Sequence, residues 1–146
     1  MEQFFSKLNF LTNGEGFTDI TDHLNLFIQK SDFHSGILSL TSLHTSCSLT
    51  INENADPNVL KDLEMYIKSI VPCNCYTSLS KDREEISYQH YQEGEDDMPA
   101  HIKTALTNTN LSLSFQKGGI MLGTWQGIYL WEHRFASKER LSLIHI

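Results

Sequence analysis

Between His44 and Pro57 the chain places titratable and hydrogen-bonding side chains at both ends of a short apolar run, 49–51. The polar members of this block are His44, Thr45, Asn52, Glu53, Asn54 and Asp56. A strand that only has to pack needs few such groups, so we expect a buried strand whose polar ends form the wall of a cleft. Imidazoles, carboxylates and amides in one cleft are suited to acid–base chemistry or to binding a divalent metal.

Two further histidines could join this cleft. We expect His101 in the first turn of a helix, where free N–H groups and the helix dipole favour an anion. His90 comes just before an acidic loop. With His44 they form a candidate metal-ligand set, and Glu53, Asp97 and Glu132 are the candidate carboxylates. Sequence spacing does not show that these residues meet, and a lone histidine beside a turn more often has a structural role.

A second polar block, Gly123–Gln126, is expected inside a long alternating strand over 120–131. Glycine at position 123 would let another backbone approach closely. Counting with a period of two places Thr124, Gln126 and Glu132 on one polar face of that strand. Trp125 would then point to the opposite face, into the core.

The overall composition excludes some partners. A chain of 146 residues suits a single domain, 1–146, and its net charge of −7 argues against general nucleic-acid binding, which needs a basic surface. Arg134, Lys138 and Arg140 are more often solvated charges, although arginine fits phosphate well when it binds one. Residues 1–7 do not resemble a signal peptide, and we see no membrane-spanning segment.

The cysteines number three, Cys47, Cys73 and Cys75. Cys73 and Cys75 are too close together for an unstrained disulfide, and no second pair exists to complete a zinc site. Reduced thiols in a cytoplasmic protein are therefore the favoured interpretation.

Hydrophobic spacing and turn residues predict the elements that must position these groups. Strands are expected over 4–11, 37–43, 47–52, 111–115, 120–131 and 141–146, and a polar loop over 73–97. We expect helices to begin with Thr21 as N-cap, with Asp56 as N-cap before Pro57, and with Asp97 or Met98 as N-cap. Their inner faces should carry Leu24, Phe27 and Ile28, then Leu60, Leu63, Ile67 and Ile70, then Ile102, Ala105 and Leu106. This order predicts an α+β fold with mainly antiparallel pairing.

The motifs together resemble the YjbQ-like family, also called secondary thiamine-phosphate synthases. The resemblance rests on 44–57, 19–21, Asp97 with His101, 123–126 and the tail 132–140, and it covers the chain from Gly16 to Ile146. It implies a two-sheet β-sandwich with about three flanking helices. It also implies a homotrimer with clefts near the subunit contacts.

The resemblance further implies a weak activity that joins a pyrimidine-methyl diphosphate to a thiazole phosphate and releases pyrophosphate. Such a cleft must neutralise the leaving diphosphate with a divalent metal (Mg or Zn), helix N-termini or arginine. The candidate catalytic residues are His44, Glu53, Asp97 and His101. The candidate substrate-binding residues are Thr45, Asn52, Asn54, Gly123, Thr124, Gln126, Glu132 and Arg140. The alternative is a non-catalytic trimeric module that binds a phosphorylated metabolite or a divalent metal.

Overall fold

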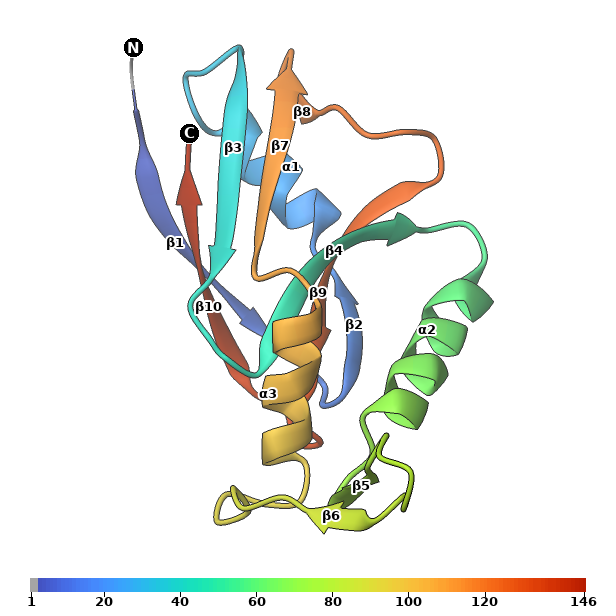
Figure 1. Ribbon diagram of the computed structural model, residues 1–146. Coiled ribbons are helices and arrows are strands. Elements are labelled where there is room, and N and C mark those ends of the chain that lie inside the picture. Colours follow the sequence, from blue (N-terminus) through green and yellow to red (C-terminus); the bar gives the residue numbers. More distant parts are fainter. Residues whose placement is uncertain (1–2) are drawn as a thin grey trace.

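Two antiparallel sheets pack face to face in the computed structural model, which describes residues 3–146 (Figure 1). The larger sheet has the order β1 (Phe5–Leu11), β10 (Glu139–His145), β3 (Ser35–Ser42), β7 (Asn110–Gln116) and β8 (Gly119–Ile120). The smaller sheet has the order β2 (Gly16–Asp19), β9 (Gln126–Glu132) and β4 (Cys47–Glu53). A separate hairpin pairs β5 (Cys75–Thr77) with β6 (Glu85–Ser87).

The main core lies between the two sheets, with helix α1 (Thr21–Gln29) closing one side. Alternate side chains of the strands turn inward, as the period-two pattern predicts: Leu38 and Leu40 from β3, and Leu49 from β4, are fully buried. The same core contains Leu24 and Ile28 of α1. The predicted α+β sandwich is therefore confirmed.

Strand β9 is buried on both faces, because helices cover the outer face of the smaller sheet. Its outward-facing Trp131 stacks on Phe17 with ring centroids 4.4 Å apart. Trp131 also packs against Ile67 and Val71, in and just after helix α2 (Pro57–Ile70). Helix α3 (Asp97–Leu106) lies beside α2 on this face (Figure 1). The two-sided burial explains why the sequence of β9 is almost continuously apolar.

Helix α2 begins as the sequence predicts. Asp56 is its N-cap, with Oδ1 accepting a hydrogen bond from the Asn58 backbone N–H at 2.8 Å, and Pro57 is its first residue. At the other end Ile70, expected on the inner face, is 51% exposed. Ile67 and Val71 stay packed against Trp131, so Ile70 alone points away from the sheet in this last turn.

The prediction for the start of α1 is wrong. The N-cap is Ile20, and no side chain among residues 3–146 caps the helix. Thr21 is the first helical residue instead: its backbone N–H donates to Asp19 Oδ1 at 2.8 Å. Its own Oγ1 accepts from the Ile128 backbone N–H at 2.8 Å. Thr21 therefore connects α1 to β9 rather than capping the helix.

The inner face predicted for α3 is correct at Ile102, which packs against the Trp131 cluster, and wrong for the other two residues. Ala105 and Leu106 are exposed, whereas Lys103 and Thr104 are buried. Lys103 can be buried because its Nζ lies 2.6 Å from a carboxylate oxygen of Glu15. The ammonium group therefore has an ionic partner that replaces the water it loses. The helix is thereby rotated relative to the face that its apolar residues suggest.

The long strand predicted over 120–131 is interrupted. Residues 121–125 form a turn between β8 and β9, closed by a hydrogen bond from the Gly123 backbone N–H to Gln126 Oε1 at 2.8 Å. Trp125, expected in the core, is 65% exposed on this turn. The Gln126 side chain bonds back to its own turn, and this local bond ends the strand even though the apolar alternation continues.

Other predictions were incomplete. The predicted loop 73–97 contains the β5–β6 hairpin, and β2 was not predicted at all. Of the segment compared with a signal peptide, Met1 and Glu2 lie outside the described residues. None of the helices in the described chain is long and apolar enough to span a bilayer.

Candidate metal centre and adjoining groove

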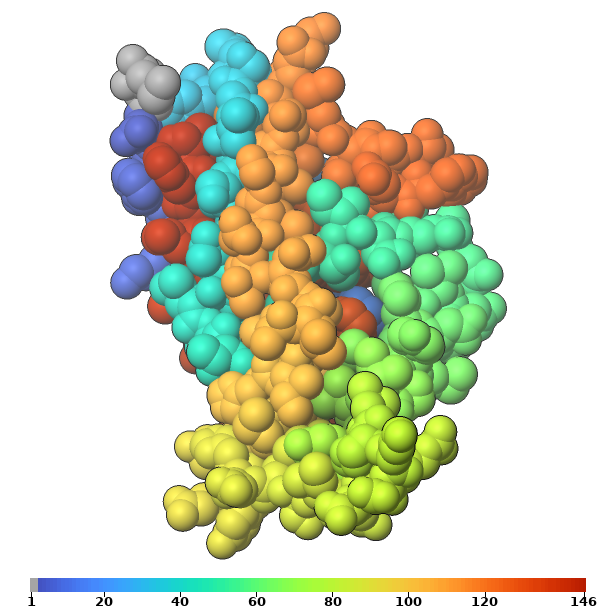
Figure 2. Space-filling model, in the orientation of Figure 1, coloured from blue at the N-terminus to red at the C-terminus, as the bar shows by residue number. Residues whose placement is uncertain are grey.

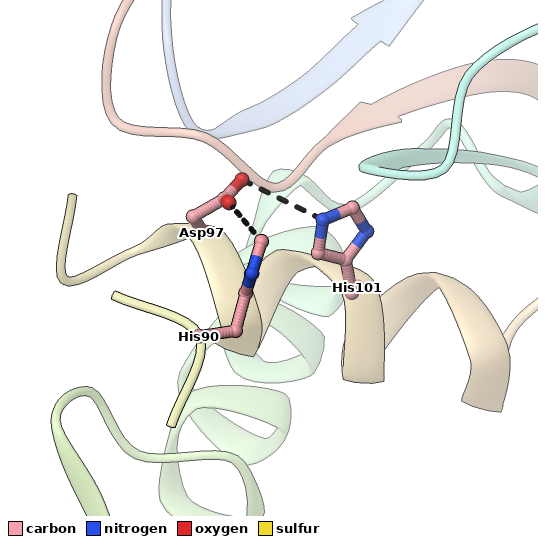
Figure 3. A group of neighbouring side chains, drawn as sticks. All are labelled: His90, Asp97 and His101. Atoms are coloured by element: carbon pink, nitrogen blue, oxygen red, sulfur yellow. Dashed lines mark ion pairs between the residues drawn. The ribbon is translucent and has the colours of Figure 1, made fainter. Parts of the chain in front are cut away.

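Three side chains that the sequence placed in a candidate cleft converge at the start of α3: His90, Asp97 and His101 (Figure 3). One ligand-type atom of each lies within 4.8 Å of the other two. His90 Nε2 is 2.6 Å from Asp97 Oδ2, and His101 Nε2 is 3.7 Å from Asp97 Oδ1. Asp97 and His101 are four residues apart and so share one face of the helix, while His90 approaches from the preceding loop.

The hydrogen bond of His101 determines which ring nitrogen faces the cluster. Its Nδ1 lies 2.9 Å from the carbonyl oxygen of Thr45. A carbonyl only accepts, so Nδ1 must carry the proton and, in the neutral ring, Nε2 presents a lone pair toward Asp97. A nitrogen lone pair and a carboxylate oxygen repel each other, so this arrangement is stabilised by a cation or a proton between them. A backbone carbonyl that fixes the tautomer in this way is typical of metal-binding histidines.

Asp97 is held by Arg134, which the sequence analysis expected to be a solvated charge. Arg134 is 9% exposed, and its Nη1 donates to Asp97 Oδ1. Its Nε donates to Asp96 Oδ2 at 3.0 Å, and its Nη2 donates to the Glu93 carbonyl at 2.7 Å. Oδ2 of Asp97 therefore remains as the oxygen available to a ligand. The signal that could have identified Arg134 is its place two residues after a strand buried on both faces.

Asp96 stays ionised in this arrangement. Burial alone would raise the pKa of Asp96, but the backbone N–H of Phe135 and the Arg134 guanidinium lower it below its ordinary value. Two carboxylates thus share one guanidinium, so with both imidazoles counted as neutral the formal charge of the group is negative. That charge favours a divalent cation over an anion at this point.

Two imidazoles and one carboxylate match the three protein ligands of catalytic zinc sites, which leave a fourth position open. In such sites neighbouring ligand atoms are about 3.4 Å apart, from bonds of about 2.1 Å. The observed spread needs only a small movement of His90, whose side chain is 50% exposed. The residues therefore fit a bound metal. His101 begins the second turn of α3 rather than the first, so its own position offers no free backbone N–H groups.

A groove of about 610 Å³ adjoins the cluster and shares His101 with it. It lies between α3 and the turn that links β3 to β4, and its other lining residues are Ser42, Leu43, His44, Thr45, Thr104, Ala105, Thr107 and Thr109. Figure 2 shows α3 and β7 running as one exposed ridge down this side of the molecule. The structure thus brings His44, Thr45 and His101 together, as the cleft hypothesis required.

His44 lies outside the metal cluster. Its Nε2 accepts a hydrogen bond from the Leu141 backbone N–H at 2.7 Å, so Nδ1 carries the proton of the neutral ring. Burial, and then the nearby Arg140, lower the pKa of His44. The nitrogen that could bind a metal is already occupied, which leaves His44 as a neutral hydrogen-bond donor.

Glu132 and Arg140, both candidates for substrate binding, form a buried ion pair instead. Glu132 is fully buried, and Arg140 Nε donates to its Oε2 at 2.6 Å. Thr12 also donates to Oε2, at 3.0 Å. The pKa of Arg140 is raised: burial opposes this shift, but the hydrogen bond to Glu132 and the attraction of Cys47 and Glu132 together outweigh it. Glu132 therefore does not continue a polar row with Thr124 and Gln126, and Arg140 is not available as a phosphate clamp.

The UPF0047 protein YjbQ-like family model matches residues 6–146. The chain belongs to this family.

Two curated relatives illustrate the similarity. The UPF0047 protein YjbQ of Escherichia coli is 41% identical over 134 residues, which is 91% of this chain and 89% of that protein. A UPF0047 protein of a Synechocystis strain is 38% identical over 135 residues, covering 92% and 85% of the two chains.

Two solved structures of similar size have the same fold. A conserved hypothetical protein from Thermus thermophilus aligns with a TM-score of 0.77 at 31% identity, over 95% of this chain and 97% of that one. An uncharacterised YjbQ/UPF0047 family protein from Clostridium acetobutylicum aligns with a TM-score of 0.75 at 27% identity, over the full length of both chains.

The remaining candidate residues of this YjbQ-like protein lie at the far end of β4, beside the turn 121–125 (Figure 1). They are Asn52, Glu53, Asn54, Gly123, Thr124 and Gln126. At about 3.3 Å per residue, the seven residues of β4 separate them from the His44 end by roughly 20 Å. Asn54 donates to the Gln126 carbonyl at 3.3 Å, and Glu53 Oε1 accepts from the Asp56 backbone N–H at 3.3 Å. Within one chain these groups hold turns and do not reach the metal cluster.

Proposed function

We propose that this YjbQ-like protein is a divalent-metal-dependent transferase that acts on phosphorylated small molecules. The reaction we propose is the secondary thiamine-phosphate synthase reaction. In it, the bond between a pyrimidine methylene carbon and a diphosphate oxygen breaks, the thiazole nitrogen bonds to that carbon, and pyrophosphate leaves. The observation that carries the proposal is the convergence of His90, Asp97 and His101.

Each residue has a distinct task in this proposal. His90, Asp97 and His101 would hold the metal, which supplies positive charge for the departing diphosphate. Arg134 holds Asp97 in position through its Oδ1. The Thr45 carbonyl keeps the Nε2 lone pair of His101 directed at the cluster. A reaction that loses a stable anion needs this neutralisation of charge more than it needs a strong nucleophile.

The donor set also bears on which metal is bound. Magnesium prefers oxygen ligands and keeps most of its water, whereas zinc binds imidazole readily. Two of the three donors here are imidazole nitrogens. We therefore propose zinc rather than magnesium as the resident ion.

The placement of Glu53 favours a second candidate, a binding module without turnover. Glu53 was a candidate for catalysis, yet it lies at the other end of β4 from the cluster. Arg134 binds Asp96, and the proposal assigns the remaining oxygen of Asp97 to the metal, so neither carboxylate serves as a general base. A site with a metal, a groove and no free base suits retention of a phosphorylated metabolite as well as its conversion.

Calorimetric titration with zinc and with magnesium tests the proposal, followed by an assay of pyrophosphate release from the two substrates. We expect zinc to bind one site per chain and His101→Ala to weaken that binding at least tenfold. His23→Ala changes a histidine on the exposed part of α1 and should bind zinc as the parent does. Zinc binding with pyrophosphate release supports the transferase, and zinc binding without release supports the module. Absence of zinc binding would contradict both.

Assembly as a homotrimer and a cytoplasmic location are also part of the proposal. The outer face of the larger sheet carries apolar side chains that nothing covers within residues 3–146: Phe5, Leu11 and Ile37 are 58–71% exposed. Such a face is typical of a contact between subunits. The cysteines Cys47, Cys73 and Cys75 are free, which suits a reducing compartment.

A further inference from the structure

We infer that the pocket between the end of α2, the β5–β6 hairpin and the start of α3 is a second ligand site, for an uncharged molecule that carries an aromatic ring. The pocket has a volume of about 760 Å³. A volume of this size lies within the range of small-molecule sites, which are concave and mostly apolar. Figure 1 shows the hairpin below the end of α2 and the start of α3.

Separate elements supply the walls of this pocket. The last turn of α2 contributes Ile70, and α3 contributes Met98 and Ile102. The hairpin contributes Tyr76 and, just after its second strand, Tyr88. A molecule in the pocket would therefore touch two helices and the hairpin at once.

The pocket is separate from the metal centre. Met98 and Ile102 are four residues apart and share one face of α3. A helix turns by about 100° per residue, so this face lies next to the one that carries Asp97 and His101. The pocket shares no lining residue with the groove beside the metal centre or with the metal-ligand set. The inference therefore goes beyond the proposed function and does not rest on it.

The lining of the pocket carries no charge. None of its ten described residues is Asp, Glu, Lys, Arg or His, although Asp, Glu, Lys and Arg make up 20% of the chain. Burial raises the pKa of Tyr88, so its hydroxyl stays neutral. Taking an ionised group out of water is costly unless an opposite charge replaces the water. The phosphorylated substrates of the proposed reaction are thus excluded here, and an uncharged molecule is favoured.

Two tyrosines favour a ligand with a ring. The ring centroids of Tyr76 and Tyr88 are 5.6 Å apart, and the ring planes are inclined by 32°. At this separation the two rings are in contact with each other and form one wall of the pocket. The Tyr88 hydroxyl donates to the Pro72 carbonyl at 3.1 Å, which holds this wall against the end of α2. A planar ring packs well against such a wall and against the thioether of Met98.

Apolar side chains at the pocket are exposed in the single chain. Ile70 is about half exposed, Tyr76 is 41% exposed and Leu79, in the turn of the hairpin, is fully exposed. A ligand that covers them removes apolar surface from water, which favours binding. The face proposed for the trimer contact belongs to the larger sheet, whereas α2 and α3 cover the outer face of the smaller sheet. A trimer built through the larger sheet would therefore leave this pocket open.

Fluorescence titration with N-phenyl-1-naphthylamine tests the inference. This probe is uncharged and becomes strongly fluorescent in apolar surroundings. Its relative 1-anilinonaphthalene-8-sulfonate has the same rings and one added negative charge. We expect the neutral probe to bind one site per chain, with or without zinc, and the sulfonate to bind at least tenfold more weakly.

Substitutions locate the bound probe. Ile70→Lys places a charge in the pocket at a half-exposed position, and we expect it to weaken binding of the neutral probe at least tenfold. Leu26→Lys is the matched control, because Leu26 is 52% exposed on α1 and does not line the pocket, so it should bind as the parent does. Tyr76→Leu removes a ring and should weaken binding at least threefold, whereas Tyr76→Phe keeps the ring and should not. Circular dichroism and the thermal midpoint of each variant establish that it is folded.

The outcomes separate this inference from the proposed function. Probe binding without zinc binding would refute the metal centre alone. Equal effects of Ile70→Lys and Leu26→Lys would overturn the inference, since the probe would then lie elsewhere, and equal affinity for the sulfonate would overturn the exclusion of charged ligands. A parent that binds no probe would also refute the site. If Ile70→Lys, but not Leu26→Lys, then lowered the mass in light scattering, a second copy of the chain would be the occupant instead.

Discussion

Glu132 accepts a hydrogen bond from the backbone N–H of Arg134, with 3.0 Å between Oε1 and the nitrogen. The same oxygen accepts from the backbone N–H of His133, also at 3.0 Å. Since Arg134 in turn binds Asp97, the buried Glu132–Arg140 ion pair is linked to the metal centre through the end of β9. The sequence suggested Glu132 and Arg140 for substrate binding, but in the structure they hold the end of β9 that carries Arg134.

Removing the charge of Glu132 should therefore be costly. Glu132→Gln would leave the Arg140 guanidinium buried without its counter-charge, and losing one partner of a buried pair costs about 3–5 kcal/mol. We expect urea denaturation to show a loss of unfolding free energy in that range. Glu139→Gln, at an exposed position of β10, should change it by less than about 0.5 kcal/mol. Equal effects of the two substitutions would show that the Glu132–Arg140 pair does not stabilise the fold.

Stability should depend on pH through His133. Burial, and then the nearby Lys103 and Arg140, lower the pKa of His133 to about 3, so the folded protein keeps this ring neutral. In the unfolded chain the same ring takes up a proton below about pH 6.5. Above about pH 6.5 the unfolding free energy does not depend on the titration of His133. As the pH drops from 6.5 toward 3, the unfolding free energy falls by about 1.4 kcal/mol per pH unit.

Denaturation of parent and variant from pH 7 to pH 4.5 measures this effect. His133→Gln removes the titrating group, so its unfolding free energy should fall less steeply with decreasing pH than that of the parent. His23→Gln, at an exposed histidine, should keep the slope of the parent. Identical slopes for His133→Gln and the parent would show that His133 is protonated equally in both states.

The trimer should be visible in solution. The exposed apolar residues on the outer face of the larger sheet, and the family resemblance, both favour it. Light scattering on the purified protein should give about three times 16.7 kDa. Ile37→Lys, on that face, should shift the mass toward that of a single chain. A monodisperse monomer of the parent at micromolar concentration would contradict the trimer.

Cys73 and Cys75 should be dispensable. Both are partly exposed, and neither contributes an atom to the metal cluster. Cys75 Sγ donates a hydrogen bond to Glu85 Oε1 at 2.7 Å, which a serine hydroxyl can replace. The double serine variant should keep its thermal midpoint within about 2 °C and bind zinc as the parent does, since exposed substitutions have small effects. Loss of zinc and of folded structure together would reveal a cysteine metal site.

Much of the fold follows from the sequence, because the relevant signals are local. Asp56 and Pro57 start α2 through bonds that span three residues, and the alternation along β7 is inherent in the strand itself. Local patterns failed at Thr21 and Trp125, where a bond to another strand or a side chain closing a turn decided the outcome. Family resemblance, rather than periodicity, predicted that the two sheets form a sandwich.

Within the site, the sequence by itself determined only that Asp97 and His101 share a helix face, because a spacing of four residues is fixed by helix geometry. Tertiary structure alone decided that His90 joins them, that Arg134 holds Asp97, and that Glu53 does not reach them. Arg134 and Asp97 are 37 residues apart in the chain, His90 approaches Asp97 from an irregular loop, and the exclusion of Glu53 depends on which end of β4 faces α3. Their position and burial are set by the packing of whole sheets and helices, which residue spacing does not encode.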